Sequence, residues 1–208
     1  MRSLLEIGLS NRSRLKMWDS KMIEIRVGIK GQSPLLMNRF PDEDPNEGSK
    51  PTARGEKGTP RERAENKTYE LDDGTLYIPG VCIFSAIMEA GKFHKLGRNK
   101  VTTQRSSLVP AGIFMKSDGC SLKTKKWEVD SRPVVNPSTG GRIICHRPRL
   151  DEWATEFVID VDTDMFSENF VRQLIDDAGA KIGLLDYRPA RKGPFGRFKV
   201  INWKVNKS

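Results

Sequence analysis

The sequence predicts an α+β fold, on the evidence of three patterns along its 208 residues. Towards both ends of the chain, polar and apolar residues alternate, as they do in strands that bury one face. Between these ends, two segments repeat apolar residues at the three- and four-residue spacing of a helix with one buried face. Hydrophobic residues make up 37% of the chain and charged residues 30%, a composition that favours one globular domain with long solvated loops.

The first strand is expected at residues 22–29, where apolar β-branched residues alternate with polar ones. The segment 41–67 contains no apolar residue larger than alanine, so burial cannot offset the entropy lost when it becomes ordered. We therefore expect a flexible insertion over residues 41–75. A short apolar run ending in a Pro-Gly break then leads into a helix expected at residues 81–93.

The middle of the chain predicts a strand followed by a hairpin. The apolar run 108–115 is expected to be a strand. Within residues 116–150, two short β-prone segments, 127–129 and 142–145, flank a turn-rich stretch and predict a hairpin. Residues 153–161 alternate clearly and predict the next strand.

The last third of the chain predicts a helix and a closing strand. Apolar residues at helical spacing place a helix at residues 166–178, with Asp162, Thr163 and Asp164 available to cap its N-terminus. Alternation returns over residues 197–205, which predicts the final strand.

In chain order these elements give the ferredoxin-like, or RRM-like, β-α-β-β-α-β arrangement, an antiparallel sheet with two helices on one face and long loop insertions. In this division residues 1–20 are an N-terminal extension, and residues 21–208 form a single ferredoxin-like domain. That domain carries the flexible insertion 41–75 and the hairpin insertion 116–150.

The charge of the chain is large and unevenly distributed. The formal net charge is +9, which favours anionic partners without separating nucleic acid from an anionic membrane. Residues 151–177 hold nine acids and one base, a net charge of −8, so the remainder of the chain carries +17. A basic face and an acidic face predict possible head-to-tail self-assembly, which is a hypothesis from charge alone.

The cysteines and the apolar runs bear on the kind of protein this is. The three cysteines are widely spaced and form no CxxC pair, which favours neither a disulfide framework nor a zinc site. No run approaches the roughly 20 apolar residues that span a bilayer. We therefore expect a soluble, cytoplasmic protein with no membrane partner.

A basic loop between the second helix and the last strand is the strongest functional signal. Residues 187–199, called the basic loop below, carry five bases and no acid. Glycines allow close approach of the backbone to a ligand, guanidinium groups can meet phosphate oxygens, and aromatic rings can stack on bases. An ordinary solvated hairpin is the alternative. The expected RNA-binding residues of the loop are Tyr187, Arg188, Arg191, Lys192, Gly193, Phe195, Gly196 and Arg197.

A second basic segment follows the first helix and contains no acid between residues 92 and 105. It adds Lys92, Lys95, Arg98 and Lys100 to the expected RNA-binding residues. We expect this segment and the basic loop to form the two walls of one groove.

Two short motifs resemble the RAMP superfamily of CRISPR-associated proteins. One is Tyr77-Ile78-Pro79-Gly80, which opens the first helix, and the other is the glycine-punctuated loop before the last strand. The sequence departs from the family pattern in two places. Residues 81–85 stand where the family continues with small and basic residues, and a long gap separates Gly183 from Gly193.

The resemblance implies a ferredoxin-like protein that grips RNA. The chain is similar to the backbone-type subunits of an antiviral ribonucleoprotein, which hold a single-stranded guide RNA together with other effector subunits. The resemblance also admits an RNA-cutting or RNA-processing ribonuclease. A phage or mobile-element structural protein with a basic face is a third reading, from another class.

The enzyme reading depends on a few titratable residues. Asp42, Glu43 and Asp44 stand where some RNA-cutting members of the family carry a carboxylate, and His94 could act as a general base or acid. The alternative is that the three carboxylates are solvated charges in a flexible loop and that His94 is an ordinary surface histidine. Asp160, Asp162 and Asp164 have the alternating spacing of a calcium-binding loop, but the glycine and glutamate that such a loop requires are absent. An acidic pair at a strand end also resembles the site of polymerase palms. We expect no catalytic residue, no metal site and no cofactor.

Overall fold

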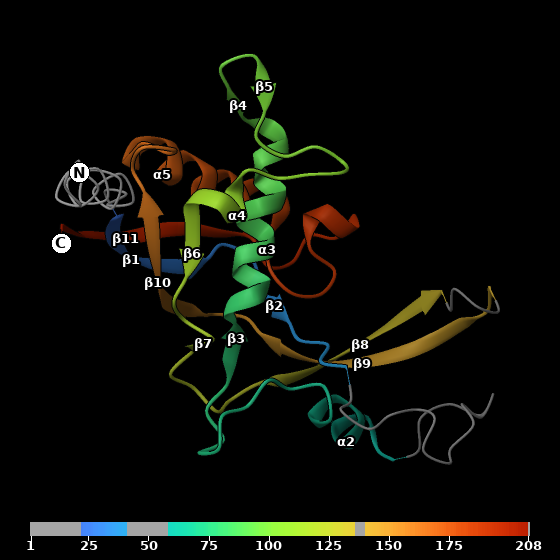
Figure 1. The fold of residues 1–208 in the computed structure, drawn as a ribbon. Helices are drawn as coiled ribbons and strands as arrows, with labels where there is room; N and C mark the ends of the chain where they lie inside the picture. Colours follow the sequence, from blue (N-terminus) through green and yellow to red (C-terminus); the bar gives the residue numbers. More distant parts are fainter. Residues whose placement is uncertain (1–21, 41–57, 136–139, 208) are drawn as a thin grey trace, which may run out of the picture.

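The computed structural model describes residues 22–40, 58–135 and 140–207. Its centre is a four-stranded antiparallel sheet with the strand order β11-β1-β10-β6. The chain passes through these strands and two helices as β-α-β-β-α-β, which is the ferredoxin-like plan expected from the sequence (Figure 1). The elements are β1 (Met22–Gly31), α3 (Gly80–Ala90), β6 (Ile113–Met115), β10 (Ala154–Asp162), α5 (Glu168–Asp177) and β11 (Phe198–Lys207).

Alternation in β1 is what orients the sheet. Ile25, Val27 and Ile29 are fully buried, whereas Arg26 and Lys30, between and beside them, are exposed. Side chains two residues apart lie on the same face of a strand, so this pattern turns one face of β1 towards the core. Both neighbours of β1, β10 and β11, come from the last third of the chain.

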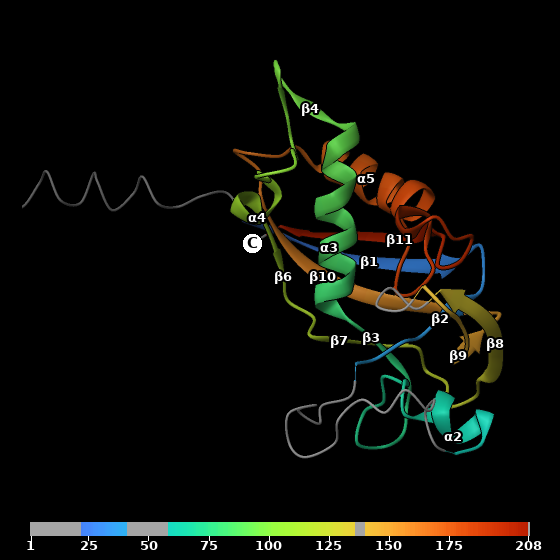
Figure 2. The ribbon, with the colours of Figure 1, turned by 90° about the vertical axis from the view of Figure 1, so that its right-hand side faces the viewer.

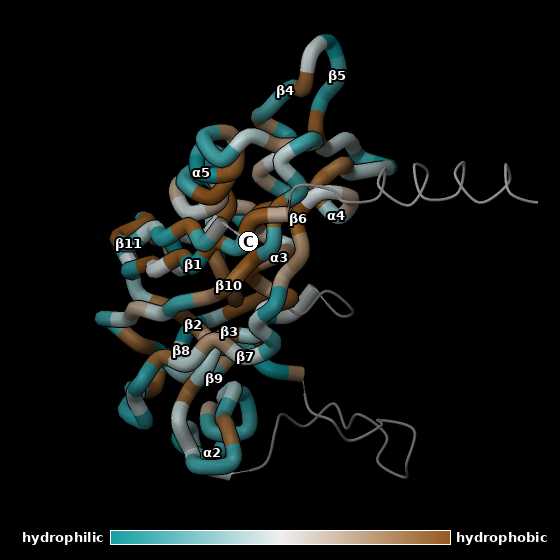
Figure 3. The backbone as a smooth tube through the Cα atoms, turned by 60° about the vertical axis from the view of Figure 1, so that its left-hand side comes forward, coloured by the Kyte–Doolittle hydropathy of each residue, from teal (hydrophilic) through white to brown (hydrophobic). Residues whose placement is uncertain are grey.

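The two helices cover the buried face of the sheet and contact each other (Figure 2). Helix α3 buries Ile83 and Ile87, and α5 buries Leu174 and Ile175, as the helical spacing predicts. Figure 3 shows the hydrophobic segments gathered where β1, β10 and α3 meet. None of the helices in the described residues is long and apolar enough to cross a membrane.

The cap of α5 differs from the prediction. Ser167 is the N-cap residue, and its side-chain oxygen accepts a hydrogen bond from the Phe170 N–H at 3.3 Å. Asp162 instead accepts a hydrogen bond from the Asp164 N–H at 2.9 Å, in the turn after β10. The helix therefore begins later than the acidic turn, where a serine satisfies its free amides.

Residues 108–115 were expected to form a single strand, but they form a helical turn followed by a short strand. The turn is α4 (Val109–Gly112), with Pro110 among its first residues, and β6 occupies only the last three positions of the run. Proline is favoured in the first turn of a helix because the missing N–H has no intrahelical acceptor there.

A second sheet carries a long hairpin that projects from the domain (Figure 1). Strand β8 (Glu128–Val135) pairs over its full length with β9 (Arg142–Leu150), as far as Arg149, and β2 (Leu35–Leu36) adds to the other side of β9. The side chains of Val135, Ile143 and Ile144 near the tip are at least half exposed.

Part of the segment expected to be a flexible insertion is structured. Residues 60–65 form helix α2 (Pro60–Glu65), whose N-terminus is closed by a capping box between Thr59 and Glu62. Ala64 is fully buried, and α2 contacts β8 and β9. Burial of a small side chain and the N-terminal cap therefore stabilise α2, without the large apolar residues that the prediction took to be necessary for ordered structure. Residues 41–57 and the expected extension 1–20 lie outside the described residues.

Two small ribbons complete the fold. Strand β3 (Tyr77–Pro79) pairs with β7 (Gly119–Ser121) beside the start of α3, and β4 (Lys95–Leu96) pairs with β5 (Asn99–Lys100) beyond its end. The β4–β5 hairpin stands at the far end of α3 from β3 in both ribbon views (Figures 1 and 2).

Candidate nucleic-acid interface

The basic loop is held in place by main-chain hydrogen bonds to the segment that follows β1. The Gly196 N–H donates to Pro34 O at 2.8 Å, and the Gln32 N–H donates to Arg197 O at 2.8 Å. Within the loop region, the Leu184 N–H donates to Gly196 O at 2.9 Å. These bonds use backbone atoms and occupy none of the side chains of the loop.

Two glycines are required by the path of the loop. Gly196 has a φ of +72°, and a Cβ atom there would collide with the carbonyl oxygen of Leu184. A Cβ atom at Gly193 would collide with the carbonyl oxygen of Tyr187. The described residues include four non-glycine residues with positive φ, and Tyr187 and Lys192 of the basic loop are two of them. Such backbone strain is concentrated at functional sites in proteins.

The β8–β9 hairpin packs against the basic loop and forms a groove with it. The Arg147 Nε lies 3.0 Å from Asp186 Oδ2, and the Arg132 guanidinium lies 4.8 Å from the centroid of the Phe195 ring. Between hairpin and loop is a cavity of about 490 Å³, called the hairpin–loop groove below. Its lining residues are Arg132, Pro133, Val134, Val135, Arg147 and Tyr187.

The aromatic residues of the basic loop have different roles. Tyr187 is 39% exposed and lines the groove. Phe195 is only 5% exposed, and its ring centroid lies 5.8 Å from that of Tyr187. Phe195 therefore supports Tyr187 from inside the protein, and its burial leaves it no surface on which a base could stack.

The four expected cations of the basic loop also divide. The Arg188 guanidinium donates to Leu185 O at 2.8 Å, and that of Arg197 donates to Ala180 O, so both are engaged with the chain itself. Arg191 and Lys192 are exposed, and no ion-pair partner is found for them within residues 22–40, 58–135 and 140–207. These two cations are the ones best placed to meet phosphate.

The second basic segment does not share a groove with the basic loop. Lys95, Arg98 and Lys100 are exposed on the β4–β5 hairpin, beyond the end of α3. The basic loop lies instead near the start of α3, where Arg188 and Cys82 line one small pocket. Lys92 forms an ion pair with Glu89 at 2.8 Å. The expectation of two facing walls was wrong, because an 11-residue helix separates them.

The histidines are engaged in structural contacts. The His94 side chain is 13% exposed, with Nε2 at 3.0 Å from Asp177 Oδ2 and the ring in an edge contact with Phe170. The Nδ1 of His146, which is 8% exposed, lies 2.7 Å from Ser131 Oγ. Asp42, Glu43 and Asp44 fall outside the described residues, and the described part of the chain contains no cluster that could hold a metal ion.

Two cysteines beside the core are kept as neutral thiols. Burial raises the pKa of the Cys120 thiol from 9.0 to about 11. Burial also raises the pKa of Cys82, although nearby Arg188 opposes the shift. A raised pKa leaves little thiolate at neutral pH, so neither side chain is a nucleophile there.

The acidic segment 151–177 is partly neutralised by its own chain. Asp151 pairs with Arg149 at 2.6 Å, Asp176 with Arg172 at 3.0 Å, and Asp177 with Lys181 at 2.7 Å. Lys116 bridges Glu24 at 2.7 Å and Asp160 at 3.5 Å. The charge segregation along the sequence is therefore weaker in space.

The sequence did not lead us to expect that residues of the β8–β9 hairpin line the groove. Arg132 and Arg147 lie on different strands of the hairpin, and the latter is 7% exposed. The basic run from His146 to Arg149 was the available signal, but only the strand register shows which of its side chains turns towards the loop.

Comparison with known proteins gives structural similarity without sequence similarity. No protein-family model matches the sequence, and no curated protein matches it. A chain of the type III-B Cmr-beta complex bound to cognate target RNA is similar over 100% of this chain and 68% of its own, with a TM-score of 0.49 and 12% identity. Cmr6 from Pyrococcus furiosus is similar over 86% of this chain and 99% of its own, with a TM-score of 0.45 and 11% identity.

A chain of a CRISPR RNA-guided surveillance complex is similar over 88% of this chain and 68% of its own, with a TM-score of 0.37 and 11% identity. Two of the three structures are therefore of Cmr proteins, and the third is of a CRISPR RNA-guided complex. The fold class of this chain follows from its own strand order.

Proposed function

We propose that this chain is an RNA-binding subunit of a CRISPR-type ribonucleoprotein of the RAMP kind, and that it holds a single strand in the hairpin–loop groove. The observation that carries the proposal is the groove itself. The exposed ring of Tyr187 lines it together with Arg132 and Arg147 of the hairpin, and Arg191 and Lys192 are exposed on the same loop as Tyr187. Stacking platforms combined with positive charge are the usual means of holding single-stranded nucleic acid.

In this proposal the groove and the adjoining part of the basic loop have separate roles; Arg191 and Lys192 belong to the loop and are not among the residues that line the groove. Arg191 and Lys192 neutralise backbone phosphates, and Tyr187 stacks on a base. Arg132 and Arg147 are positioning residues, since the first lies over the Phe195 ring and the second pairs with Asp186. Because phosphate and ring contacts are made by every nucleotide, binding in the groove is largely independent of sequence.

Further subunits and head-to-tail copies of this chain belong to the same proposal. The half-exposed apolar side chains at the hairpin tip, Val135, Ile143 and Ile144, offer a contact surface for a neighbouring subunit. A single strand of RNA running through successive grooves would align such subunits.

The test begins with the purified protein. Its ratio of absorbance at 260 and 280 nm, together with sequencing of any RNA it carries, is expected to show bound RNA. Binding of a labelled 30-nucleotide single strand is expected to exceed binding of the same sequence as a duplex. Equal affinity for both forms, or no binding at low salt, would overturn the proposal.

The same labelled RNA separates binding from cleavage. Incubation with Mg²⁺ is expected to leave the RNA intact. Cleavage that is lost on Asp42→Ala/Asp44→Ala or His94→Ala substitution would favour the ribonuclease reading instead. An oligomer that assembles equally well in the absence of nucleic acid would favour a structural protein.

A further inference from the structure

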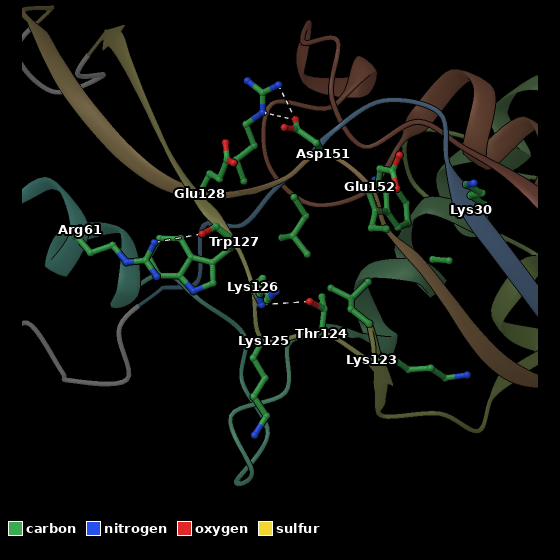
Figure 4. A pocket seen from close by; sticks show the side chains of 15 residues that line it. Lys30, Arg61, Lys123, Thr124, Lys125, Lys126, Trp127, Glu128, Asp151 and Glu152 are labelled. Carbon is green, nitrogen blue, oxygen red and sulfur yellow. Dashed lines mark hydrogen bonds and ion pairs between the residues drawn. The ribbon is translucent and has the colours of Figure 1, made fainter.

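A second and larger pocket lies at the base of the β8–β9 hairpin, and it shares no lining residue with the hairpin–loop groove. This basal pocket has a volume of about 900 Å³. It is formed by the connection from β7 to β8, the connection from β9 to β10, the end of β1 and helix α2 (Figure 4). None of its residues was predicted from the sequence to bind a ligand, although Asp151 and Glu152 belong to the acidic segment 151–177.

Cations without partners line the basal pocket. Within residues 22–40, 58–135 and 140–207, no ion pair is formed by Lys30, Lys123 or Lys126. Lys123 has a φ of +54°, and it is one of the four non-glycine residues with positive φ in the described chain. Figure 4 shows Lys30 and Lys123 on one side of the pocket, across from Arg61.

The opposite side of the basal pocket is a stacked pair. The Arg61 guanidinium lies 3.4 Å from the centroid of the Trp127 ring, and its Nη1 donates to Trp127 O at 3.2 Å. The guanidinium therefore lies over the indole ring and is also bonded to the backbone of the same residue. Aromatic rings and guanidinium planes are the surfaces on which unpaired bases stack. The buried side chains of Leu122, Leu150 and Trp153 form the apolar part of the lining.

The basal pocket also contains carboxylates that have no cation of their own. Glu128 and Glu152 are exposed, line the pocket, and form no ion pair with any described residue. Asp151, by contrast, is paired with Arg149 at 2.6 Å. Free lysines and free glutamates therefore face one cavity without neutralising each other.

A ligand for this cavity must satisfy both signs of charge. An acidic peptide would pair with the lysines but would be repelled by Glu128 and Glu152. A nucleotide offers phosphate oxygens to the lysines, a flat ring to the Arg61–Trp127 stack, and the amino group of its base to a carboxylate. The volume of about 900 Å³ is at the upper end of the range for small-molecule sites and accommodates a nucleotide unit.

We infer that the basal pocket binds an unpaired nucleotide of an RNA strand and selects bases that carry an exocyclic amino group. The inference rests on the proposed function for the RNA itself and adds a site at which sequence is read. Cytosine donates from its N4 amino group to a glutamate, whereas uracil presents the O4 acceptor at the same position and is repelled.

Competition between homopolymers tests the inference. Oligo(rC) of ten nucleotides is expected to bind the wild-type protein at least about 5-fold more tightly than oligo(rU), the lower end of the discrimination given by one good base contact. The variant Glu128→Ala/Glu152→Ala is expected to lose this preference. The matched control Glu156→Ala removes an exposed carboxylate of β10 that does not line the pocket, and it is expected to keep the preference.

Several outcomes would overturn the inference. Equal binding of oligo(rC) and oligo(rU) by the wild type is one, and an unchanged preference in the double glutamate variant is another. Tighter binding of a ten-residue polyglutamate peptide than of oligo(rC), lost on Lys123→Ala/Lys126→Ala substitution, would assign the pocket to an acidic protein segment. Circular dichroism checks folding, and Lys126→Ala alone serves if the double lysine variant does not fold.

The groove variant separates this inference from the proposed function. Arg191→Ala/Lys192→Ala is expected to weaken both homopolymers by the same factor and to preserve the ratio between them. If the wild type binds no RNA, both proposals fail together. If it binds RNA without base preference and the groove variant weakens it, only the basal pocket assignment fails.

Discussion

The sharpest test of the proposed RNA-binding surface is the removal of two exposed cations of the basic loop. Arg191 and Lys192 are exposed and have no ion-pair partner among the described residues. The basic loop is fixed by main-chain hydrogen bonds, such as the Gly196 N–H to Pro34 O bond of 2.8 Å. Arg191→Ala/Lys192→Ala is therefore expected to leave the fold intact and to change binding alone.

The magnitude follows from counterion release. Each phosphate neutralised on a single strand contributes about 0.7 to the slope of log affinity against log salt concentration, so two contacts contribute about 1.4. At 0.1 M salt this slope corresponds to a loss of about 25-fold in affinity. Between 50 and 200 mM salt, the wild type is expected to lose about 7-fold more affinity than the variant.

Fluorescence anisotropy of a labelled 20-nucleotide RNA, measured at several salt concentrations, gives both quantities. The matched control is Arg26→Ala/Lys204→Ala, which removes the same charge from two exposed residues paired across β1 and β11. An equal change of slope in the two double variants would show that net charge matters and position does not. No change of slope in the groove variant would refute the phosphate contacts.

Four other substitutions or reactions give separate readouts. Tyr187→Ala is expected to weaken RNA binding by about 1–3 kcal/mol while Tyr187→Phe retains it, since the ring supplies the stacking; equal losses in the anisotropy assay would contradict this. Phe195→Ala is expected to lower stability by about 3–5 kcal/mol, because the side chain is 5% exposed, and to lower the melting temperature by roughly 10 °C. Arg147→Ala, which leaves Asp186 unpaired, is expected to cost about 2 kcal/mol in urea unfolding, and Arg147→Met/Asp186→Leu less. At pH 8, iodoacetamide is expected to alkylate Cys120 about 100-fold more slowly in the folded than in the denatured protein. The reason is that burial raises the pKa of this thiol from 9.0 to about 11. Mass spectrometry of the labelled peptide measures the two rates.

The elements of the fold were predictable where one periodicity dominates. Strand β1 and helix α5 each bury one face, and their sequences repeat accordingly. The prediction of a strand over residues 108–115 was wrong because a continuous apolar run shows no periodicity by which a buried helical turn could be distinguished from a strand. Helix α2 was missed because its burial depends on alanine and its stability on a cap.

The candidate site was predictable only in part, since it joins segments that are distant in the sequence. The composition of the basic loop indicated a ligand, and its glycines indicated a constrained backbone. Nothing in the loop indicates that Arg132 and Arg147 approach it from the hairpin, because this depends on how two sheets pack. For the same reason the sequence did not indicate that Phe195 is buried beneath Tyr187.

The strand order of the central sheet also has a consequence for how the chain is made. Strand β1 is synthesised before both strands that pair with it, β10 and β11, which lie within residues 154–207. Contacts between segments so far apart in sequence form slowly, since closing the intervening loop must precede any gain from pairing. Until then the apolar face of β1 has no sheet to join. We therefore expect the central sheet to be completed only after β11 has been synthesised, and the nascent chain to be prone to aggregation until then.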